Sequence, residues 1–246
     1  MLDYDKEAER YDASRGGEPR AAAAAEAVLG LLPAGTRRLL DVACGTGIVT
    51  RRLAARDGLS VTGVDLAPAM ARQAAARLPG SVVLADSRRL PFGDGGFDAV
   101  SSVWLLHLAP TDDDVRTIIG ECARVLRPGG VYVTTVDKAA AHNVGSDIDA
   151  VLASRPRRPA RDEAALVESY ALAHGLVRAG QARFAGRGQG RSPRRTVADL
   201  HRGWFVALPP GGALADGFAA RLAQLPDQDR PRPDPVFSLR AFLKPE

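Results

Sequence analysis

The residues best suited to chemistry stand in one short stretch, residues 39–48, which reads LLDVACGTGI. An apolar run interrupted only by Asp41 predicts a buried strand, and the small residues after it predict a tight turn before a helix. Gly45 and Gly47 let the backbone pass close to a ligand, where a larger side chain would collide. A carboxylate near the strand end suits an amine or a cation better than a phosphate. The stretch therefore predicts a loop that binds a ligand with an amine or a positive charge.

Two further carboxylates follow expected strands. Asp65 ends the strand expected at 61–64, and Asp86 follows the strand expected at 81–84. An acid in the first position can accept both hydroxyls of a ribose, and a carboxylate can accept from the exocyclic amine of adenine. Because ligands of open parallel sheets bind at the carboxyl ends of the strands, we expect these acids to meet Asp41 at one edge.

A dinucleotide site is the less favoured interpretation of the same loop. Such a site needs three glycines, so that a pyrophosphate lies on the helix N-terminus. Thr50 occupies the third glycine position here, and Asp41 would repel a phosphate.

Strands and helices alternate over the first half of the chain, which favours a parallel sheet with right-handed crossovers. The expected strands are residues 39–42, 61–64, 81–84, 97–101, 131–136, 180–184 and 236–243. The expected helices are residues 20–32, 49–56, 67–77, 147–153, 162–174, 196–208 and 213–225. A further helix is expected between residues 67–77 and 147–153; Thr111 caps it with Asp114, and it stops at residues 128–130.

We expect one α/β domain: a Rossmann-like, seven-stranded, mostly parallel sheet with helices on both faces and a helical cap. Its expected parts are an N-terminal helical lid (1–35), a cofactor-binding core (36–138), a cap or substrate region (139–210), and a C-terminal helix and last strand (211–246).

Over residues 36–136 the chain resembles the class I S-adenosylmethionine-dependent methyltransferases that modify small molecules. The motifs that carry this resemblance are residues 39–47, Gly63-Val-Asp-Leu66, Ala85-Asp-Ser87 with Leu90-Pro-Phe92, Phe97-Asp-Ala-Val100 and Leu126-Arg-Pro-Gly-Gly130. Tyr4-Asp5 and residues 11–15 resemble the family's N-terminal lid. Ala43 departs from the motif, which often has its first glycine there.

The resemblance implies S-adenosylmethionine as the cofactor, S-adenosylhomocysteine as its product, and a role for each matching residue. Asp41 would lie under the ammonium, Gly45 and Gly47 along the methionine part, Asp65 at the ribose, Leu66 and Met70 beside adenine, and Asp86 at its amine. Tyr11 would cover the cofactor and Arg15 would pair with its carboxylate; a surface aromatic and a solvated charge remain open for these two. The other positions of the expected cofactor site are Ala43, Ser87, Ser102 and Val103.

The sequence contains fewer signals for the residues that would bind the methyl acceptor. A sulfonium is already activated, so the transfer needs no metal, and we expect no metal site. A base is needed only for a weakly acidic acceptor. His107 is the first candidate and His142 the second, against the alternative of structural histidines. The expected substrate pocket comprises Trp104, His107, Tyr170, His201, Trp204 and Phe205, although the last three are also typical of cap packing.

Composition limits the remaining classes of protein. No apolar run approaches 18 residues, the first ten residues are mostly charged, and the only cysteines are Cys44 and Cys122. We therefore expect a cytoplasmic protein with no membrane partner and no disulfide framework. The net charge of +4 comes almost wholly from arginine, with clusters at residues 155–161 and 178–195.

The favoured function is methyl transfer to an O, N or C atom of a small molecule, a specialised metabolite in natural product biosynthesis. A nucleic-acid or protein methyltransferase that uses the arginine-rich cap is the alternative. Aromatic residues make up only 5%, which disfavours a nucleic-acid surface. A cofactor-binding protein without activity also stays open, as does the choice between monomer and homodimer.

Overall fold

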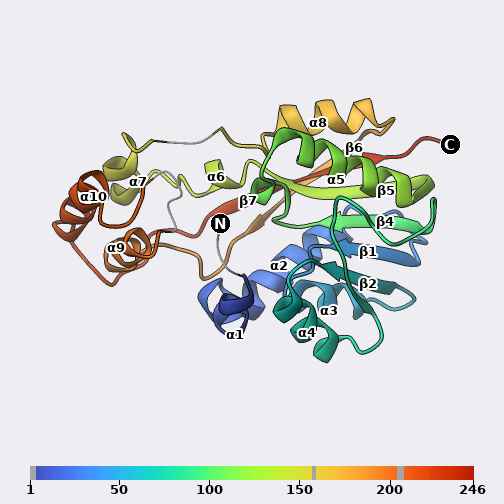
Figure 1. Cartoon of the computed structure of the whole chain (residues 1–246), viewed down its shortest axis with the longest axis horizontal. Coiled ribbons are helices and arrows are strands. Elements are labelled where there is room, and N and C mark those ends of the chain that lie inside the picture. Colours follow the sequence, from blue (N-terminus) through green and yellow to red (C-terminus); the bar gives the residue numbers. More distant parts are fainter. Residues whose placement is uncertain (1–3, 157–158, 204–207) are drawn as a thin grey trace.

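A seven-stranded sheet forms the centre of the computed structural model, which describes residues 4–156, 159–203 and 208–246. The strand order is β3-β2-β1-β4-β5-β7-β6 (Figure 1). The strands are β1 Arg38–Val42, β2 Ser60–Asp65, β3 Val82–Leu84, β4 Phe97–Ser102, β5 Leu126–Val136, β6 Val177–Ala185 and β7 Val236–Leu243. The pairs among β1 to β5 are parallel, whereas β7 is antiparallel to β5 and to β6. This confirms the expected Rossmann-like, mostly parallel sheet.

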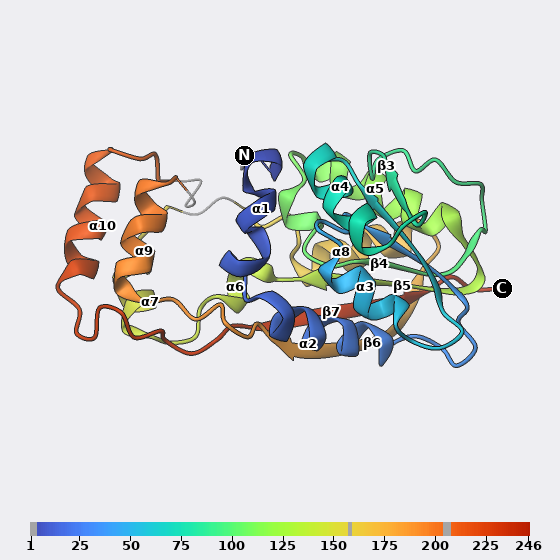
Figure 2. The same ribbon diagram turned by 90° about the horizontal axis from the view of Figure 1, so that it is seen from below.

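Helices cover both faces of this sheet (Figures 1 and 2). They are α1 Tyr4–Ser14, α2 Gly17–Leu29, α3 Ile48–Ala54, α4 Pro68–Arg77, the 3-10 turn η1 Leu106–Leu108, α5 Asp112–Val125, α6 Lys138–Ala141, α7 Asp147–Leu152, α8 Ala164–Ala173, α9 Pro193–His201 and α10 Ala213–Ala223. Leu39 of β1 packs with α2 and α3, and its neighbour Leu40 packs with α5 and α8. Successive strand residues face opposite sides, so a sheet covered on both faces needs the continuous apolar strands that the sequence contains.

The expected boundaries hold most closely where a local signal sets them. Thr111 and Asp114 form the expected capping box at the start of α5. The expectation that this helix runs to residues 128–130 is wrong, because α5 ends at Val125 and β5 already begins at Leu126. Leu126 pairs with Phe97, and a register shift then brings Val131 opposite Ala99. An irregularity in the pairing thus accommodates the Pro-Gly-Gly segment inside the strand.

The helices α7, α9 and α10 form a separate lobe beside the sheet (Figure 1). Its core contains Ile148, Leu152, Leu200, Phe218 and Leu222. This packing differs from the expected cap of residues 139–210. The helix α8 buries an apolar side against α5, β6 is an edge strand of the sheet, and α10 joins the lobe.

None of the helices within the described ranges is both long enough and apolar enough to cross a membrane.

Candidate functional site

The loop between β1 and α3 turns through left-handed backbone at three positions. The φ angles are 58° at Ala43, 57° at Gly45 and 76° at Gly47. A Cβ at Gly47 would lie 2.9 Å from the Cα of Ala74 in α4, so this glycine lets the loop pack against that helix. A Cβ at Gly45 would meet no atom within 4 Å. Gly45 therefore faces open space, while Ala43 adopts a conformation that costs a non-glycine residue some strain.

Asp65, at the end of β2, holds the glycine loop in place. Its Oδ2 accepts from the backbone N–H of Gly45 at 2.8 Å, and its Oδ1 accepts from Ala67 at 2.9 Å. Burial raises the pKa of this carboxyl, although the backbone hydrogen bonds act in the other direction. Each carboxylate oxygen keeps a further lone pair, so the group is oriented and can still accept from two ligand hydroxyls.

Asp41 lies beneath the same loop with only 3% of its surface exposed. The hydroxyl of Thr50 donates to Oδ2 at 2.6 Å, and that of Ser101 donates to Oδ1 at 2.7 Å. Burial raises the pKa of this carboxyl to about 6, and the two hydroxyls only partly offset the effect. A nearby ammonium would favour the ionised form and remove part of the cost of burial.

A cavity of about 540 Å³ opens at the carboxyl edge of the strands, above this loop. Most of the expected cofactor residues line it. They are Tyr11, Asp41, Ala43, Gly45, Asp65, Leu66, Met70, Asp86, Ser87 and Val103. Trp104, expected in the substrate pocket, lines it as well. The fold thus brings residues from five separate segments of the chain to one hollow.

The helix α1 closes one side of the cavity, to which it contributes Tyr4, Asp5 and Tyr11. The hydroxyl of Thr46 in the glycine loop donates to Asp12 at 2.7 Å, and Asp12 also pairs with Arg77 of α4 at 2.7 Å. The backbone N–H of Ala69 donates to Asp5 at 2.7 Å. The lid helix is therefore fastened to the loop and to α4 by hydrogen bonds and charge.

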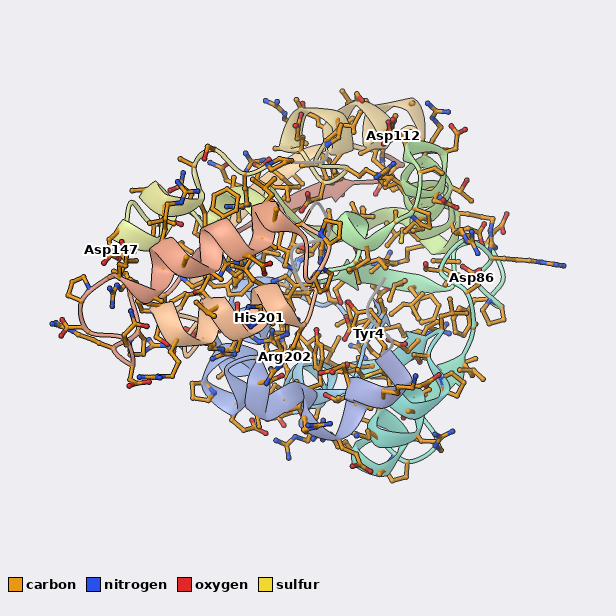
Figure 3. The ribbon with its side chains drawn as sticks, turned by 60° about the vertical axis from the view of Figure 1, so that its left-hand side comes forward. Tyr4, Asp86, Asp112, Asp147, His201 and Arg202 are labelled. Atoms are coloured by element: carbon orange, nitrogen blue, oxygen red, sulfur yellow. The ribbon has the colours of Figure 1, made fainter. Side chains whose placement is uncertain are left out.

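Asp86 stands at the far end of the cavity from the lobe (Figure 3). Arg88 donates to it through Nε at 3.1 Å and Nη2 at 2.7 Å, which lowers the pKa of the carboxyl. The side chain is thus an ionised acceptor, as an exocyclic amine would require.

Three of the expected cofactor residues do not line the cavity. Gly47 packs against α4, as described above. The hydroxyl of Ser102 lies inside the sheet, where it contacts Tyr132 at 2.7 Å and Thr134 at 2.9 Å, so its expected contact with the cofactor is wrong. The guanidinium of Arg15 lies 5.8 Å from the centre of the Tyr11 ring, at the end of the lid.

Neither candidate base lines the cavity. His107 belongs to η1, just past Trp104, and its Nδ1 is buried without a hydrogen-bond partner. Burial, reinforced by Lys138, holds the pKa of His107 well below its usual value. The ring of His142 lies edge-on to Phe237 at 5.6 Å, and burial together with Arg191 lowers its pKa to about 2. Both imidazoles are therefore neutral, and burial disfavours their protonated forms.

The remaining substrate-pocket residues lie away from this cavity. Tyr170 sits on α8 under the guanidinium of Arg116, and it packs against the main core. His201 is exposed on α9 in the lobe (Figure 3). The expectation that these two line a common pocket with Trp104 is wrong, because α8 packs on α5 and α9 belongs to the lobe. Trp204 and Phe205 lie outside the described residues.

Arg20 is a site residue that the sequence does not reveal. It is only 3% exposed, it lines the cavity, and its guanidinium lies 4.2 Å from the centre of the Trp104 ring. Its Nε is buried without a hydrogen-bond partner. The residue stands in the alanine-rich α2, where its type suggests an exposed charge. Its placement next to apolar alanines is the only local sign of burial.

The residues that line the cavity fit S-adenosylmethionine. A cationic side chain, Arg20, suits a carboxylate at one end, and Asp41 and Asp65 suit an ammonium and a ribose diol. Leu66, Met70 and Asp86 form an apolar slot with an acceptor, which suits adenine. The open space at Gly45 allows close approach to the backbone. The volume is within the range of cofactor sites.

Comparisons with known proteins agree with this geometry. Residues 40–134 match the model of the methyltransferase domain family. An uncharacterised methyltransferase of Mycobacterium tuberculosis is 43% identical over 106 residues, which cover 43% of this chain and 42% of that protein. A ubiquinone biosynthesis O-methyltransferase of Xanthomonas oryzae is 39% identical over 113 residues, which cover 42% of this chain and 45% of that protein.

Solved structures share the fold over more of the chain. The [4+2]-cyclase SpnF matches 98% of this chain and 93% of its own, with a TM-score of 0.60 and 22% identity. The geranyl diphosphate C-methyltransferase of Streptomyces coelicolor matches 91% and 79%, with a TM-score of 0.54 and 18% identity.

The chain spans less than half the length of the curated relatives it matches, and the matched part contains most of the residues that line the cavity. Residues 40–134 thus match the methyltransferase domain family, and the chain has the fold of the class I S-adenosylmethionine-dependent methyltransferases.

Proposed function

We propose that this chain transfers a methyl group from S-adenosylmethionine to an O, N or C atom of a small molecule. The observation that carries the proposal is the cavity, in which the glycine loop, Asp41, Asp65 and Asp86 converge beneath a fastened lid. The ubiquinone and hydroquinone methyltransferases among the relatives are named for small acceptors, which supports a small acceptor here. A specialised metabolite and a cytoplasmic location are parts of the same proposal.

The cofactor, when bound, would supply an activated methyl group on a sulfonium. The chain would supply position and environment. Asp65 would accept from the ribose hydroxyls while it holds the loop, Asp41 would face the ammonium, and Arg20 or Arg15 would pair with the carboxylate. Tyr4 and the rest of α1 would exclude water from the reacting atoms. Much of the rate of an in-line displacement can come from such positioning.

A general base is needed only for an acceptor that must lose a proton. His107 is the base in this proposal, because it follows Trp104 at the cavity wall and its buried Nδ1 has no hydrogen-bond partner. It stands behind the cavity wall, so contact with an acceptor requires that Trp104 or the lid shift. If His107→Ala leaves kcat within about threefold, the base role is refuted.

The charges in the second half of the chain argue against nucleic-acid or protein methylation. Several of its arginines already pair with carboxylates: Arg178 with Glu168, Arg194 with Asp229 and Arg232 with Asp147. Arg157 and Arg158 lie outside the described residues. Phosphate contacts would make binding fall steeply with salt, whereas a small acceptor in a closed pocket would bind almost independently of salt.

The proposal is tested with purified protein in two steps. Calorimetry should show that S-adenosylhomocysteine binds, and failure to bind would refute the proposed cofactor. Incubation with methyl-labelled cofactor and a metabolite panel should then give a labelled product. Because SpnF, a cyclase, has the same fold, binding without any transfer would indicate a different reaction and contradict the proposal.

A further inference from the structure

Polar contacts, rather than buried apolar area, hold the lid helix α1 to the rest of the protein. Ala8 is the single residue of this helix that is buried. Its ties to the glycine loop and to α4 run through Asp12 and Asp5. The next helix, α2, differs, because several of its alanines and Val28 are buried against α3 and the sheet. Since few apolar contacts hold α1, it can separate from the core at a lower free-energy cost than α2 can.

Two consecutive glycines join α1 to α2. Gly16 has a φ of 87° and Gly17 has a φ of 52°, so both adopt left-handed backbone. Glycine populates this region without steric cost, and a pair of such residues can absorb a large change of φ and ψ. The helix α1 can therefore turn about these two residues while α2 stays packed. Because α1 closes one side of the cavity, such a turn would open that side.

A segment that leads into the lobe meets this glycine pair. It is segment 187–195, the loop after β6 and the first residues of α9. A Cβ at Gly16 would lie 2.1 Å from the carbonyl oxygen of Arg187, and one at Gly188 would lie 3.1 Å from the Cα of Gly16. The two stretches of backbone therefore touch, and glycine permits this approach. The helix α1 accordingly lies between α9 and α4 (Figure 2).

Two side chains of segment 187–195 donate to carbonyls at the end of the lid helix. The Nε2 of Gln189 donates to the carbonyl oxygen of Arg15 at 3.1 Å, and the guanidinium of Arg195 donates to that of Ser14. The last carbonyls of a helix have no partner within it and carry the negative end of its dipole. The last turn of α1 contains no basic residue, and Arg195 brings a cation to it from 181 positions later in the chain.

Segment 187–195 is fixed on the lobe side by contacts of its own. The carboxylate of Asp234 accepts from the N–H of Gly188 at 3.2 Å and from that of Gly190 at 2.7 Å. The hydroxyl of Ser192 accepts from the N–H of Arg195 at 3.3 Å and so caps α9, which packs on α10 in the lobe. The segment therefore connects the lobe to the end of the lid without passing through the cavity.

We propose that segment 187–195 is a latch through which the lobe controls the exchange of the cofactor. The helix α1 turns about Gly16 and Gly17 to admit and release the cofactor, and Gln189 and Arg195 are positioning residues that hold α1 closed. These contacts involve protein groups alone, so they stabilise the closed lid with and without the cofactor. The inference rests on the cofactor site of the proposed function and does not depend on the acceptor.

The latch makes a kinetic prediction that a direct contact with the cofactor does not make. Entry and release both require an open lid, so loss of the latch should raise the rate constants for association and for dissociation together. The Kd should then change less than either rate constant. Loss of a direct contact would instead raise the dissociation rate constant and the Kd, with little change in association.

The first experiment measures both rate constants for S-adenosylhomocysteine on the whole protein by surface plasmon resonance. We expect Arg195→Ala to raise both at least about threefold, and Gln189→Ala/Arg195→Ala at least about tenfold. Arg195→Lys can still donate to the carbonyl of Ser14, so both rate constants should stay within about 1.5-fold of the unaltered protein. Arg194→Ala is the control and should change neither, because Arg194 is exposed and pairs with Asp229.

Two results of this experiment would overturn the latch. One is a double variant whose rate constants both stay within about 1.5-fold of those of the unaltered protein. The other is a rise in the dissociation rate constant alone, which would indicate a contact with the cofactor. Failure of the unaltered protein to bind S-adenosylhomocysteine would refute the proposed function instead.

The second experiment measures hydrogen exchange without any ligand, so it tests the latch separately from the cofactor. We expect the amides of α1 to exchange at least about fivefold faster in Gln189→Ala/Arg195→Ala, while those of α2 keep their rates. Gly16→Ala should act in the same way, because its Cβ would collide with the carbonyl of Arg187. Gly17→Ala should have a smaller effect, because its Cβ would make only an ordinary contact at 3.7 Å. Unchanged exchange in α1 of the double variant, or equal acceleration in α1 and α2, would overturn the proposal.

Discussion

The glycine loop and the cavity wall formed by Arg20 and Trp104 position their charged side chains by different means. At the glycine loop, carboxylates and backbone groups at strand ends are fixed by hydrogen bonds, as in the contact of Asp65 with Gly45. At the wall, the long side chain of Arg20 reaches the cavity from α2 and lies over the ring of Trp104. The difference teaches that a short, rigid motif can define a cofactor site, whereas a wall assembled from distant side chains leaves no motif.

The sharpest test of the comparison is Asp65→Ala. It removes both the anchor of the glycine loop and the expected acceptor of the ribose hydroxyls. We expect the Kd for S-adenosylhomocysteine to rise by about a hundredfold or more. Asp57→Ala, which removes an exposed acid in the turn before β2, serves as the control and should not change the Kd. Calorimetry that finds the two variants equal would contradict the role of Asp65.

Substitutions of the two loop glycines, Gly47 and Gly45, should have different effects on stability and on cofactor binding. In Gly47→Ala the new Cβ meets α4 and the backbone is left-handed, so we expect the free energy of unfolding to fall by about 3 kcal/mol. Gly45→Ala should cost about 1 kcal/mol of stability, because only the backbone is strained, but it should abolish cofactor binding. Gly58→Ala is the control, because Gly58 also has a left-handed backbone in open space but does not line the cavity. Denaturant melts and calorimetry measure both effects, and intact binding in Gly45→Ala would argue against contact there.

Asp41 predicts a pH dependence. Because burial raises its pKa from 3.8 to about 6, the protonated form stabilises the free protein below pH 3.8, and this contribution is lost as the pH rises through 6. A cofactor ammonium needs the ionised form, so cofactor affinity should fall up to about tenfold for each pH unit below 6. Asp41→Asn should bind weakly without this dependence. A Kd for S-adenosylhomocysteine that is constant between about pH 5 and 8 in the unaltered protein would exclude an ionised Asp41 from recognition of the cofactor.

The smallest expected effect lies in the lobe. Arg232 donates to Asp147 through Nε at 2.8 Å and Nη2 at 2.6 Å, and so ties α7 to the segment before β7. Arg232→Ala should lower the free energy of local opening of α7 by about 1 kcal/mol, measured as faster hydrogen exchange in this helix. It should not change cofactor binding. Arg230→Ala, at an exposed pair 3.7 Å from Asp227, should have no effect. Weakened cofactor binding in Arg232→Ala would show that this contact also acts on the cofactor site.

The sequence by itself determined the sheet, the glycine loop and most of the wall of the cavity. Local signals were enough, because a buried strand followed by small residues and a capped helix allows few structures, and parallel strands bring their carboxyl ends to one edge. The positions of Asp41, Asp65 and Asp86 follow from that rule alone. The part of the site that is built from strand ends could therefore be predicted residue by residue.

Only the tertiary structure decided the rest of the cavity wall. The burial of Arg20 and the absence of Tyr170 and Ser102 from the cavity depend on which faces of distant elements pack together. The periodicity of the sequence does not predict this packing, because one hydrophobic pattern in a helix is compatible with several packing partners. Side-chain length is the physical reason for the difference: a short carboxylate at a strand end is placed by its own backbone, whereas a long cationic side chain is placed by the elements that surround it.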